Sequence, residues 1–132
     1  MNRRRIMVID SEEIIRDMAK ISLEVDGYAV ETFLNGESAL ARMRSQRFDV
    51  VVTDYQMEDI DGVEVLRSVK RDYPCTTVIM MSAHPEFKNV PEVLRGELHE
   101  FFLKPFNIKS LKESIHRALI GAGDRARTDL EM

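Results

Sequence analysis

Apolar residues along this chain fall into short continuous runs separated by stretches with helical spacing. The runs RRIMVID, FDVVVTD and TTVIMMSA are compact and rich in strand-forming residues. YAVETF alternates between apolar and polar residues, as a half-exposed strand does, and EFFLK is a further short strand near the end of the chain. The pattern therefore predicts five short strands.

The stretches between these strands have the periodicity of amphipathic helices. In the first of them, apolar residues recur over residues 14–25 until Gly27 stops the pattern, and Asn35 is the predicted N-cap of the next helix. The last helix is predicted to end near Gly121. The apolar stripes of the two later helices are formed by Val63, Leu66 and Val69 and by Ile108, Leu111, Ile115 and Leu119.

Strands that alternate with helices indicate a parallel sheet covered by helices on both faces. The first, third and fourth strands are nearly continuous in apolar residues, as strands buried on both faces are. At 132 residues the chain is long enough for one domain with a substantial core. We therefore predict a doubly wound, five-stranded α/β domain over residues 1–120, followed over residues 121–132 by a polar tail or the start of a linker.

Composition narrows the class of protein. The net charge of −4 provides no basic face for nucleic acid, and the basic cluster Arg3-Arg4-Arg5 is short. No apolar run reaches the ~18 residues of a membrane span, and acids interrupt the N-terminus before it forms the core of a signal peptide. The single cysteine, Cys75, excludes an internal disulfide and a cysteine-based metal cage. These features predict a cytoplasmic protein that binds neither nucleic acid nor membrane directly.

Candidate chemistry lies where the predicted strands end, because sites in such sheets form at the carboxyl ends of the strands. Asp10 ends the first strand, and Asp54 ends the third. Ser82 ends the fourth strand, and Lys104-Pro105 ends the fifth. Two acids, a hydroxyl and an ammonium are thus predicted to meet at one edge of the sheet.

This combination of groups favours phosphoryl transfer to a carboxylate. An aspartate can attack a phosphoryl group and hold it covalently. The reaction brings two anions together, so it requires a divalent cation with oxygen ligands, and Mg²⁺ fits. A lysine can neutralise a further phosphoryl oxygen, and a hydroxyl can donate to another.

The motifs IMVIDSEE, VVVTDYQMEDIDG, VIMMSAH and FFLKPF, in this order and at these intervals, resemble a response-regulator receiver domain of two-component signalling systems. The resemblance extends from about Arg4 to Leu119. It implies a flavodoxin-like fold with strand order 2-1-3-4-5. It also implies that Asp54 is the phosphorylated residue and that Asp10 is an acidic residue of the metal site.

The same resemblance implies roles for the residues around Asp54. Ser82 matches the hydroxyl that moves toward the phosphoryl group, and Lys104 matches the lysine that pairs with it. Gln56 matches the position whose backbone carbonyl completes the metal site, and Phe101 matches the aromatic residue that switches together with Ser82. Gln56 and His84 match positions that border the phosphoryl group and tune its hydrolysis, although a solvated loop position for the histidine stays open.

One departure from the family lies directly in the predicted metal site. The family has two consecutive acids after the first strand, whereas this chain has Asp10-Ser11. Ser11 is a weaker and neutral metal ligand, so Mg²⁺ affinity is predicted to be reduced while phosphorylation is retained. Glu12 is a candidate to compensate through a water molecule.

The loop after the third strand is strongly acidic. Glu58 takes the place of a family proline, and with Asp59 and Asp61 it is attributed to loop solvation rather than to metal binding. Gly62 is predicted to supply a positive φ at the turn into the next helix.

Prolines mark the region between the fourth strand and the last helix. Pro85 and Pro91 fall where the family has its fourth helix, so this helix is predicted to be short, shifted or partly unwound. Pro105 matches a family proline that follows a cis peptide bond. In the family the fourth helix, fifth strand and fifth helix form the output face. We therefore expect an altered output face, and a homodimer formed through it stays open.

The leading interpretation is a phosphoacceptor that takes a phosphoryl group on Asp54 from a sensor histidine kinase or a phosphotransfer protein. It would act on a downstream effector protein or domain, with no enzyme activity beyond slow self-phosphorylation and self-dephosphorylation. A phosphorylation-independent binding scaffold is the alternative, suggested by Ser11 and the unusual fourth helix. A Mg²⁺-dependent aspartyl phosphatase is less favoured, because such enzymes need a general acid where this chain has Gln56.

Overall fold

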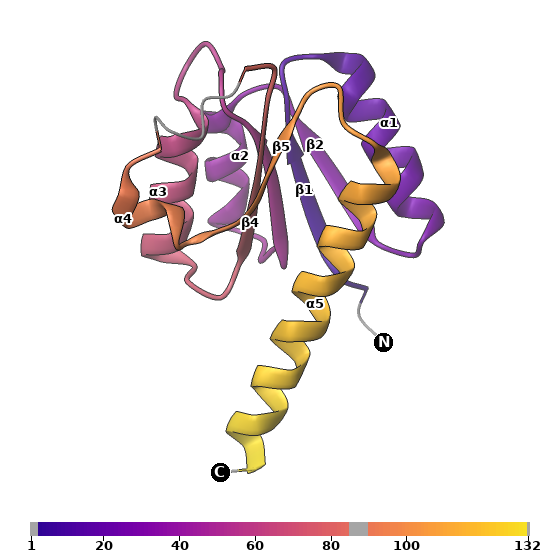
Figure 1. Cartoon of the computed structure of the whole chain (residues 1–132), viewed down its shortest axis with the longest axis vertical. Coiled ribbons are helices and arrows are strands. Elements are labelled where there is room, and N and C mark those ends of the chain that lie inside the picture. Colours follow the sequence, from indigo (N-terminus) through magenta and orange to yellow (C-terminus); the bar gives the residue numbers. More distant parts are fainter. Residues whose placement is uncertain (1–2, 85–89, 132) are drawn as a thin grey trace.

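The sheet has five parallel strands in the order β2-β1-β3-β4-β5 in a computed structural model that describes residues 3–84 and 90–131 (Figure 1). Each neighbouring pair of strands is parallel. The predicted fold class and strand order are therefore confirmed. The strands are β1 (Arg5–Ile9), β2 (Ala29–Phe33), β3 (Val50–Asp54), β4 (Thr77–Ser82) and β5 (Leu98–Leu103).

Helices cover both faces of the sheet, which is the doubly wound arrangement expected from the alternation of elements (Figure 1). On one face, α1 and α5 contribute to a core cluster, and on the other face α2 and α3 contribute to a second cluster. The short helix α4 also packs on the face covered by α2 and α3, through Leu94. The helices are α1 (Glu13–Val25), α2 (Gly36–Met43), α3 (Gly62–Asp72), α4 (Glu92–Arg95) and α5 (Ile108–Glu131).

The central strand β3 is buried along its whole length. Successive side chains of a strand point to opposite faces, so Val50 and Val52 join the cluster under α1 and α5 while Val51 joins the cluster under α2 and α3. Each buried valine contributes roughly 1.5 kcal/mol or more to folding through loss of exposed apolar surface. This packing on both faces fixes the position of Asp54 at the end of the strand.

Helix α1 forms where the apolar periodicity predicted it, but much of that apolar stripe does not face the sheet. Ile14, Ile21 and Val25 are 76%, 66% and 79% exposed. The contacts with the core are made instead by Ala19 and Leu23, which are buried. Periodicity predicted the helix correctly, whereas the side that packs depends on the sheet beneath it.

The acidic loop after β3 caps two helices. Asp59 accepts hydrogen bonds from the backbone N–H groups of Gly36 (3.3 Å) and Glu37 (2.7 Å) at the start of α2. Asp61 is the N-cap of α3 and accepts from the N–H of Glu64 at 2.9 Å. The attribution of these two acids to loop solvation was therefore wrong, because both satisfy helix amides that have no partner within the helix.

The predicted N-cap of α2 is confirmed at Asn35, whose side chain accepts from the N–H of Ser38 at 2.9 Å. The start of α2 thus receives acceptors from two segments that lie far apart in the sequence, since Asp59 follows β3. The second of these contacts ties α2 to the loop that also bears Asp54.

We expect Asp59→Ala to lower the free energy of unfolding by about 1 kcal/mol, the usual cost of losing a helix cap. Burial opposes the shift, but the N–H groups of Glu37, Ile60 and Gly36 hold the pKa of Asp59 below its ordinary 3.8. The stabilisation should therefore be present above pH 3.8 and be lost as the pH falls through the lowered value. Thermal unfolding at neutral and at strongly acidic pH measures both effects.

Glu58→Ala is the matched control for this prediction, because Glu58 is an exposed acid in the same loop. It should leave the unfolding temperature within about 2 °C of the wild type, as most surface substitutions do. An equal loss of stability in the two variants would contradict the capping role of Asp59.

Gly62 is required by a close approach to the end of β3. Its φ is not positive, so the predicted reason for this glycine was wrong. A Cβ at this position would lie 2.5 Å from the backbone carbonyl oxygen of Asp54. The N–H of Gly62 donates to the carbonyl of Tyr55 at 2.8 Å. The start of α3 is thereby packed directly against the backbone that positions Asp54.

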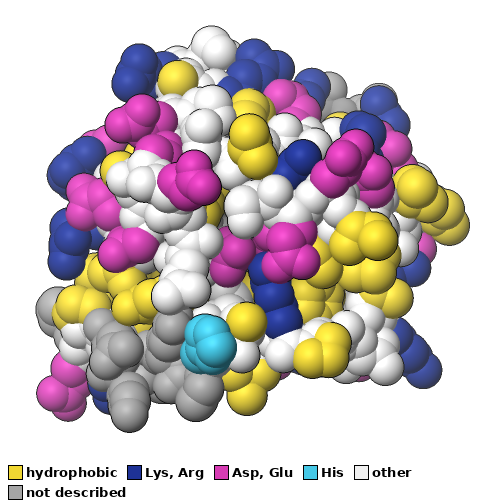
Figure 2. Space-filling model, turned by 90° about the horizontal axis from the view of Figure 1, so that it is seen from above, with side chains coloured by type: hydrophobic (Ala, Val, Ile, Leu, Met, Phe, Trp, Pro, Cys, Tyr) yellow, Lys and Arg dark blue, Asp and Glu magenta, His cyan; other side chains and the backbone are white. Residues whose placement is uncertain are grey.

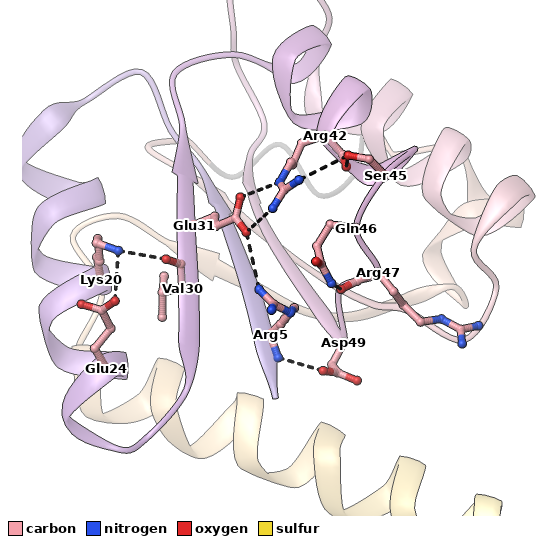
Figure 3. A network of polar contacts seen from close by, with 10 residues as sticks. All are labelled: Arg5, Lys20, Glu24, Val30, Glu31, Arg42, Ser45, Gln46, Arg47 and Asp49. Atoms are coloured by element: carbon pink, nitrogen blue, oxygen red, sulfur yellow. Dashed lines mark hydrogen bonds and ion pairs between the residues drawn. The ribbon is translucent and has the colours of Figure 1, made fainter. Parts of the chain in front are cut away.

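The edge strand β2 is tied to its neighbours by a charged network (Figure 3). Glu31 accepts two hydrogen bonds from Arg42 of α2, at 2.8 and 3.1 Å, and forms an ion pair with Arg5 of β1 at 3.7 Å. The hydrogen bond from Arg42 is the main reason why the pKa of Glu31 is lowered. Arg5 also donates its backbone N–H to Asp49 at 2.8 Å. This network holds α2 and the sheet edge together at the end opposite to the predicted site.

The region of the fourth helix is irregular, as predicted. Helix α4 has only four residues, and Pro91 precedes it as the N-cap with no side-chain capping bond. Val90, just before it, is buried in the cluster under α2 and α3. Pro85, the other proline behind this prediction, lies outside the described residues.

Helix α5 continues as far as Glu131. The prediction that it ends near Gly121 was wrong, because a glycine costs only about 1 kcal/mol in a helix interior and does not end a helix by itself. Within the part of the chain that the structure describes, no helix is both long enough and apolar enough to cross a membrane.

Candidate functional site

The candidate site lies at the carboxyl edge of the sheet, where four strands end. Asp10 follows β1, Asp54 is the last residue of β3, and Ser82 is the last residue of β4. Lys104 follows β5, and its backbone N–H donates to the carbonyl of Ser82 at 2.7 Å. The parallel order β1-β3-β4-β5 places these ends side by side, as expected from the sequence.

Lys104 lies among three carboxylates. Its Nζ atom is 2.7 Å from Asp10 Oδ2, 3.2 Å from Asp54 Oδ2 and 3.3 Å from Glu12 Oε1. The side chains of Asp10, Asp54 and Lys104 are 0%, 9% and 10% exposed, whereas that of Glu12 is 59% exposed. Three carboxylates around one ammonium leave two negative charges uncompensated. Acidic side chains accordingly flank a basic one near the middle of the face shown in Figure 2.

The pKa values of the two central groups reflect this crowding. Burial and the neighbouring Asp10 raise the pKa of Asp54 above its ordinary 3.8, although Lys104 and the backbone N–H of Gln56 act against the shift. Burial opposes any rise at Lys104, but its contacts with Asp10 and Asp54 raise its pKa above 10.5. Lys104 is therefore charged at neutral pH. The ionised form of Asp54 is less stable in this site than it would be in water.

Asp10 has one satisfied and one unsatisfied oxygen. Oδ1 accepts the backbone N–H of Glu12 at 2.9 Å, and the backbone carbonyl of Asp10 accepts from Arg16 at 2.6 Å. Oδ2 is buried and has no hydrogen-bond partner among the described residues, so its short contact with Lys104 is an ion pair without hydrogen-bond alignment. A buried carboxylate oxygen in this state is suited to a cation.

The remaining predicted residues lie around this centre. Ser82 is buried, and its hydroxyl accepts the backbone N–H of His84 at 3.2 Å. His84, Gln56 and Ser11 have exposed side chains. Phe101 is half-buried on β5, opposite Met80 of β4, and packs against the cluster under α2 and α3. The Lys104–Pro105 peptide bond is cis, as the resemblance implied.

Sequence reasoning missed the contact between Glu12 and Lys104. The two residues are 92 positions apart, and the periodicity of α1 contains no sign of it. The one available signal was a second acidic residue immediately after the strand end, in DSEE.

The groups at this edge of the sheet form a donor set that fits Mg²⁺. Over residues 3–84 and 90–131, no three His, Cys, Asp or Glu side chains are arranged as a ligand cluster. Mg²⁺ does not need such a cluster, since it keeps several waters and is commonly bound by one or two carboxylates. The unsatisfied Asp10 oxygen, the adjacent Asp54 carboxylate and the excess negative charge fit this ion, whereas Ser11 adds no charge.

The fold and the site together define a class: flavodoxin-like α/β domains with paired acids and a lysine at the carboxyl edge of the sheet. A family model described as the response regulator receiver domain matches residues 6–116. The chain belongs to this family, the receiver domains of two-component systems, as the motifs implied. Such domains are switches rather than enzymes, and they work with histidine kinases and downstream effectors.

Relatives and solved structures agree with this assignment. The chain is 30% identical over 115 residues to the regulatory protein AtoC of Escherichia coli, covering 87% of this chain and 25% of AtoC. A receiver domain protein from Methanospirillum hungatei has 26% identity and a TM-score of 0.88, with 94% and 99% of the two chains covered. The response regulator TrrA of Thermotoga maritima, solved in complex with Mg²⁺-BeF, has 30% identity and a TM-score of 0.78 over 87% and 98%. The chain spans less than half of the length of the curated relatives AtoC and ResD.

Proposed function

We propose that this domain is a phosphoacceptor whose Asp54 receives a phosphoryl group from a sensor histidine kinase or a phosphotransfer protein. The observation that supports this most directly is a nearly buried carboxylate at a strand end with a lysine ammonium 3.2 Å away. Burial and Asp10 raise the pKa of Asp54, so its ionised carboxylate is a more basic nucleophile than that of an exposed aspartate.

In the proposed transfer, an Asp54 carboxylate oxygen forms a bond to phosphorus while the bond from phosphorus to the donor imidazole nitrogen breaks. The electron pair of the broken bond stays on that nitrogen. Lys104 offsets the negative charge of the phosphoryl oxygens. The Ser82 hydroxyl, which now accepts from the N–H of His84, is the proposed donor to another phosphoryl oxygen.

Asp10, Asp54 and the backbone carbonyl of Gln56 are the proposed ligands of Mg²⁺, with Ser11 as a weak neutral contributor. When bound, the ion supplies positive charge that lets an anionic donor approach the two carboxylates. TrrA, a solved relative, was determined in complex with Mg²⁺-BeF, which supports the same ion here.

We expect Ser11→Asp to tighten Mg²⁺ binding by about tenfold, or about 1.4 kcal/mol. The added charge would lie beside Asp10, and two unit charges 4 Å apart gain about 4 kcal/mol at an effective dielectric constant of about 20, before desolvation is subtracted. Isothermal titration with MgCl₂ measures the affinity. Ser45→Asp adds the same charge at an exposed serine after α2, so its Mg²⁺ affinity should equal that of the wild type. If Ser11→Asp binds Mg²⁺ no more tightly than the wild type, the prediction that Ser11 reduces Mg²⁺ affinity is wrong.

Ser82 and Phe101 form the proposed two-state element that reports phosphorylation, and Gln56 and His84 are the proposed residues that tune hydrolysis. The proposed output face consists of the short α4, β5 and α5. It would contact a downstream effector protein or domain, or a second copy of this chain. We further propose residues 1–120 as the receiver unit, residues 121–132 as a polar tail or the start of a linker, and a cytoplasmic location.

One experiment tests the phosphoacceptor proposal against its alternatives. The protein is incubated with acetyl phosphate and Mg²⁺, and intact-mass and peptide mass spectrometry are used to find the added phosphoryl group. A stable adduct on Asp54 supports the proposal. Absence of an adduct supports a phosphorylation-independent binding scaffold, and rapid release of many equivalents of phosphate supports an aspartyl phosphatase.

A further inference from the structure

Glu12 occupies the N-cap position of α1, but its side chain makes no capping hydrogen bond. A side chain at this position usually accepts from amides of the first helical turn. The Glu12 carboxylate instead contacts Lys104 Nζ at 3.3 Å, while its backbone N–H donates to Asp10. The residue is thus connected to the site through both its backbone and its side chain.

The three carboxylates compete for one ammonium. An ammonium has three N–H donors, and Lys104 has three carboxylate neighbours. A phosphoryl group on Asp54 first takes the place of the Asp54 carboxylate at this lysine, and a second phosphoryl oxygen that pairs with the ammonium must replace the contact of Asp10 or of Glu12. Asp10 is fully buried and has the shortest contact, at 2.7 Å, whereas Glu12 is 59% exposed and has the longest. The contact with Glu12 costs least to break, because water can solvate the released carboxylate.

The Glu12 carboxylate lies in the same cluster as the proposed metal ligands Asp10 and Asp54, since all three contact Lys104 Nζ. This carboxylate lies against the ammonium, which is the group that would pair with a phosphoryl oxygen. Glu12 therefore acts directly on the group that would pair with the phosphoryl oxygen.

We propose that Glu12 is a positioning residue that holds Lys104 in the unphosphorylated domain and competes with the phosphoryl group on Asp54 for its ammonium. The inference rests on the proposed phosphoacceptor function. It means that the resting site contains its own anionic competitor, which lowers the stability of the phosphorylated state relative to a site without this acid.

Beryllofluoride, the phosphoryl analogue in the TrrA complex, is a suitable probe. Isothermal titration at saturating Mg²⁺ would compare the wild type with Glu12→Gln. We expect the variant to bind about two- to fivefold more tightly, because a partly exposed ion pair contributes roughly 0.5–1 kcal/mol. Glu13→Gln removes the same charge from the exposed neighbour in the first turn of α1 and should bind as the wild type does.

Two further measurements distinguish the contact between Glu12 and Lys104 from an effect of overall charge and from an effect on Mg²⁺ binding. Glu12→Asp keeps the charge but shortens the side chain by one methylene, so it should bind beryllofluoride as tightly as Glu12→Gln. The Mg²⁺ affinity of Glu12→Gln, measured without beryllofluoride, should equal that of the wild type. A wild-type result for Glu12→Asp, or a tenfold loss of Mg²⁺ affinity in Glu12→Gln, would overturn the proposal.

The outcome also distinguishes this inference from the function on which it rests. If the wild type binds beryllofluoride and all the variants bind it equally, Glu12 does not compete for Lys104, and the phosphoacceptor function stands. If the wild type does not bind beryllofluoride at any Mg²⁺ concentration, both proposals fail.

Discussion

Asp54→Asn is expected to abolish the phosphoryl adduct and, at the same time, to stabilise the folded domain at pH 7. The amide has no carboxylate oxygen that can attack phosphorus. The stabilisation follows from burial and from the adjacent Asp10, both of which raise the pKa of Asp54 above 3.8 and make its ionised form costly. Because folding raises this pKa, we expect the variant to unfold at a higher temperature than the wild type at pH 7.

The pH dependence identifies the cause of this gain. A carboxyl group whose pKa is raised by folding contributes stability that is complete below its unfolded value and is lost as the pH rises through the folded value. The advantage of Asp54→Asn should therefore be full at neutral pH and should disappear as the pH falls toward 3.8. Thermal unfolding across this range, together with the mass measurement of the adduct, tests both parts.

Asp72→Asn is the matched control, because the exposed Asp72 has the opposite kind of shift. Its hydrogen bond with Arg71 lowers the pKa of Asp72, so removing this charge should not stabilise the domain. An adduct that persists in Asp54→Asn would place the phosphoryl group elsewhere. A variant that is less stable than the wild type at pH 7 would contradict the cost assigned to ionised Asp54.

Lys104→Met is expected to lower the free energy of unfolding by about 3–5 kcal/mol at pH 7, the range found when one partner of a buried ion pair is removed. Asp10 and Asp54 would remain buried together without the ammonium that now lies 2.7 and 3.2 Å away. The pKa of Lys104 is raised above 10.5, so the stabilisation from its ion pairs is complete at neutral pH and is lost only as the pH rises through the folded value.

Urea unfolding in the presence of a chelator measures this loss without interference from divalent ions. Lys112→Met is the control, since Lys112 pairs with Asp26 at 3.2 Å near the surface and should cost less than about 1 kcal/mol. The deficit of Lys104→Met should shrink at acid pH, where Asp54, whose pKa is raised, takes up a proton. Equal losses in the two variants would show that the buried carboxylates do not depend on Lys104.

From the sequence we could predict which chemical groups stand at the strand ends and at which edge of the sheet they meet. Three valines followed by Asp54 are sufficient to predict a buried strand that ends in a carboxylate. Once the strands are known to be parallel, Asp10 and Lys104 must lie at the same edge. That topology brings the groups to one edge, and the packing of the side chains there gives the observed contacts of 2.7 and 3.2 Å. The roles of Ser82, Phe101, Gln56 and His84 in signalling stay predictions.

Other parts of the prediction failed where the outcome depended on distant segments. Asp59 is a helix cap because α2, more than 20 residues earlier, presents its amides there. Gly62 is needed because a side chain would meet the carbonyl of Asp54. The apolar stripe of α1 shows that a helix forms, yet Ile14 and Val25 remain exposed, since Ala19 and Leu23 face the sheet.

The acids of this chain illustrate the division between sequence and tertiary structure. The sequence alone determined the alternating strands and helices and which chemical groups stand at the strand ends, because periodicity and strand length are local properties of the chain. Only the tertiary structure decided which partner each acid takes: Lys104 for Asp10, Asp54 and Glu12, and helix amides for Asp59 and Asp61. The distance between a side chain and a group tens of residues away is set by packing, which no local pattern encodes.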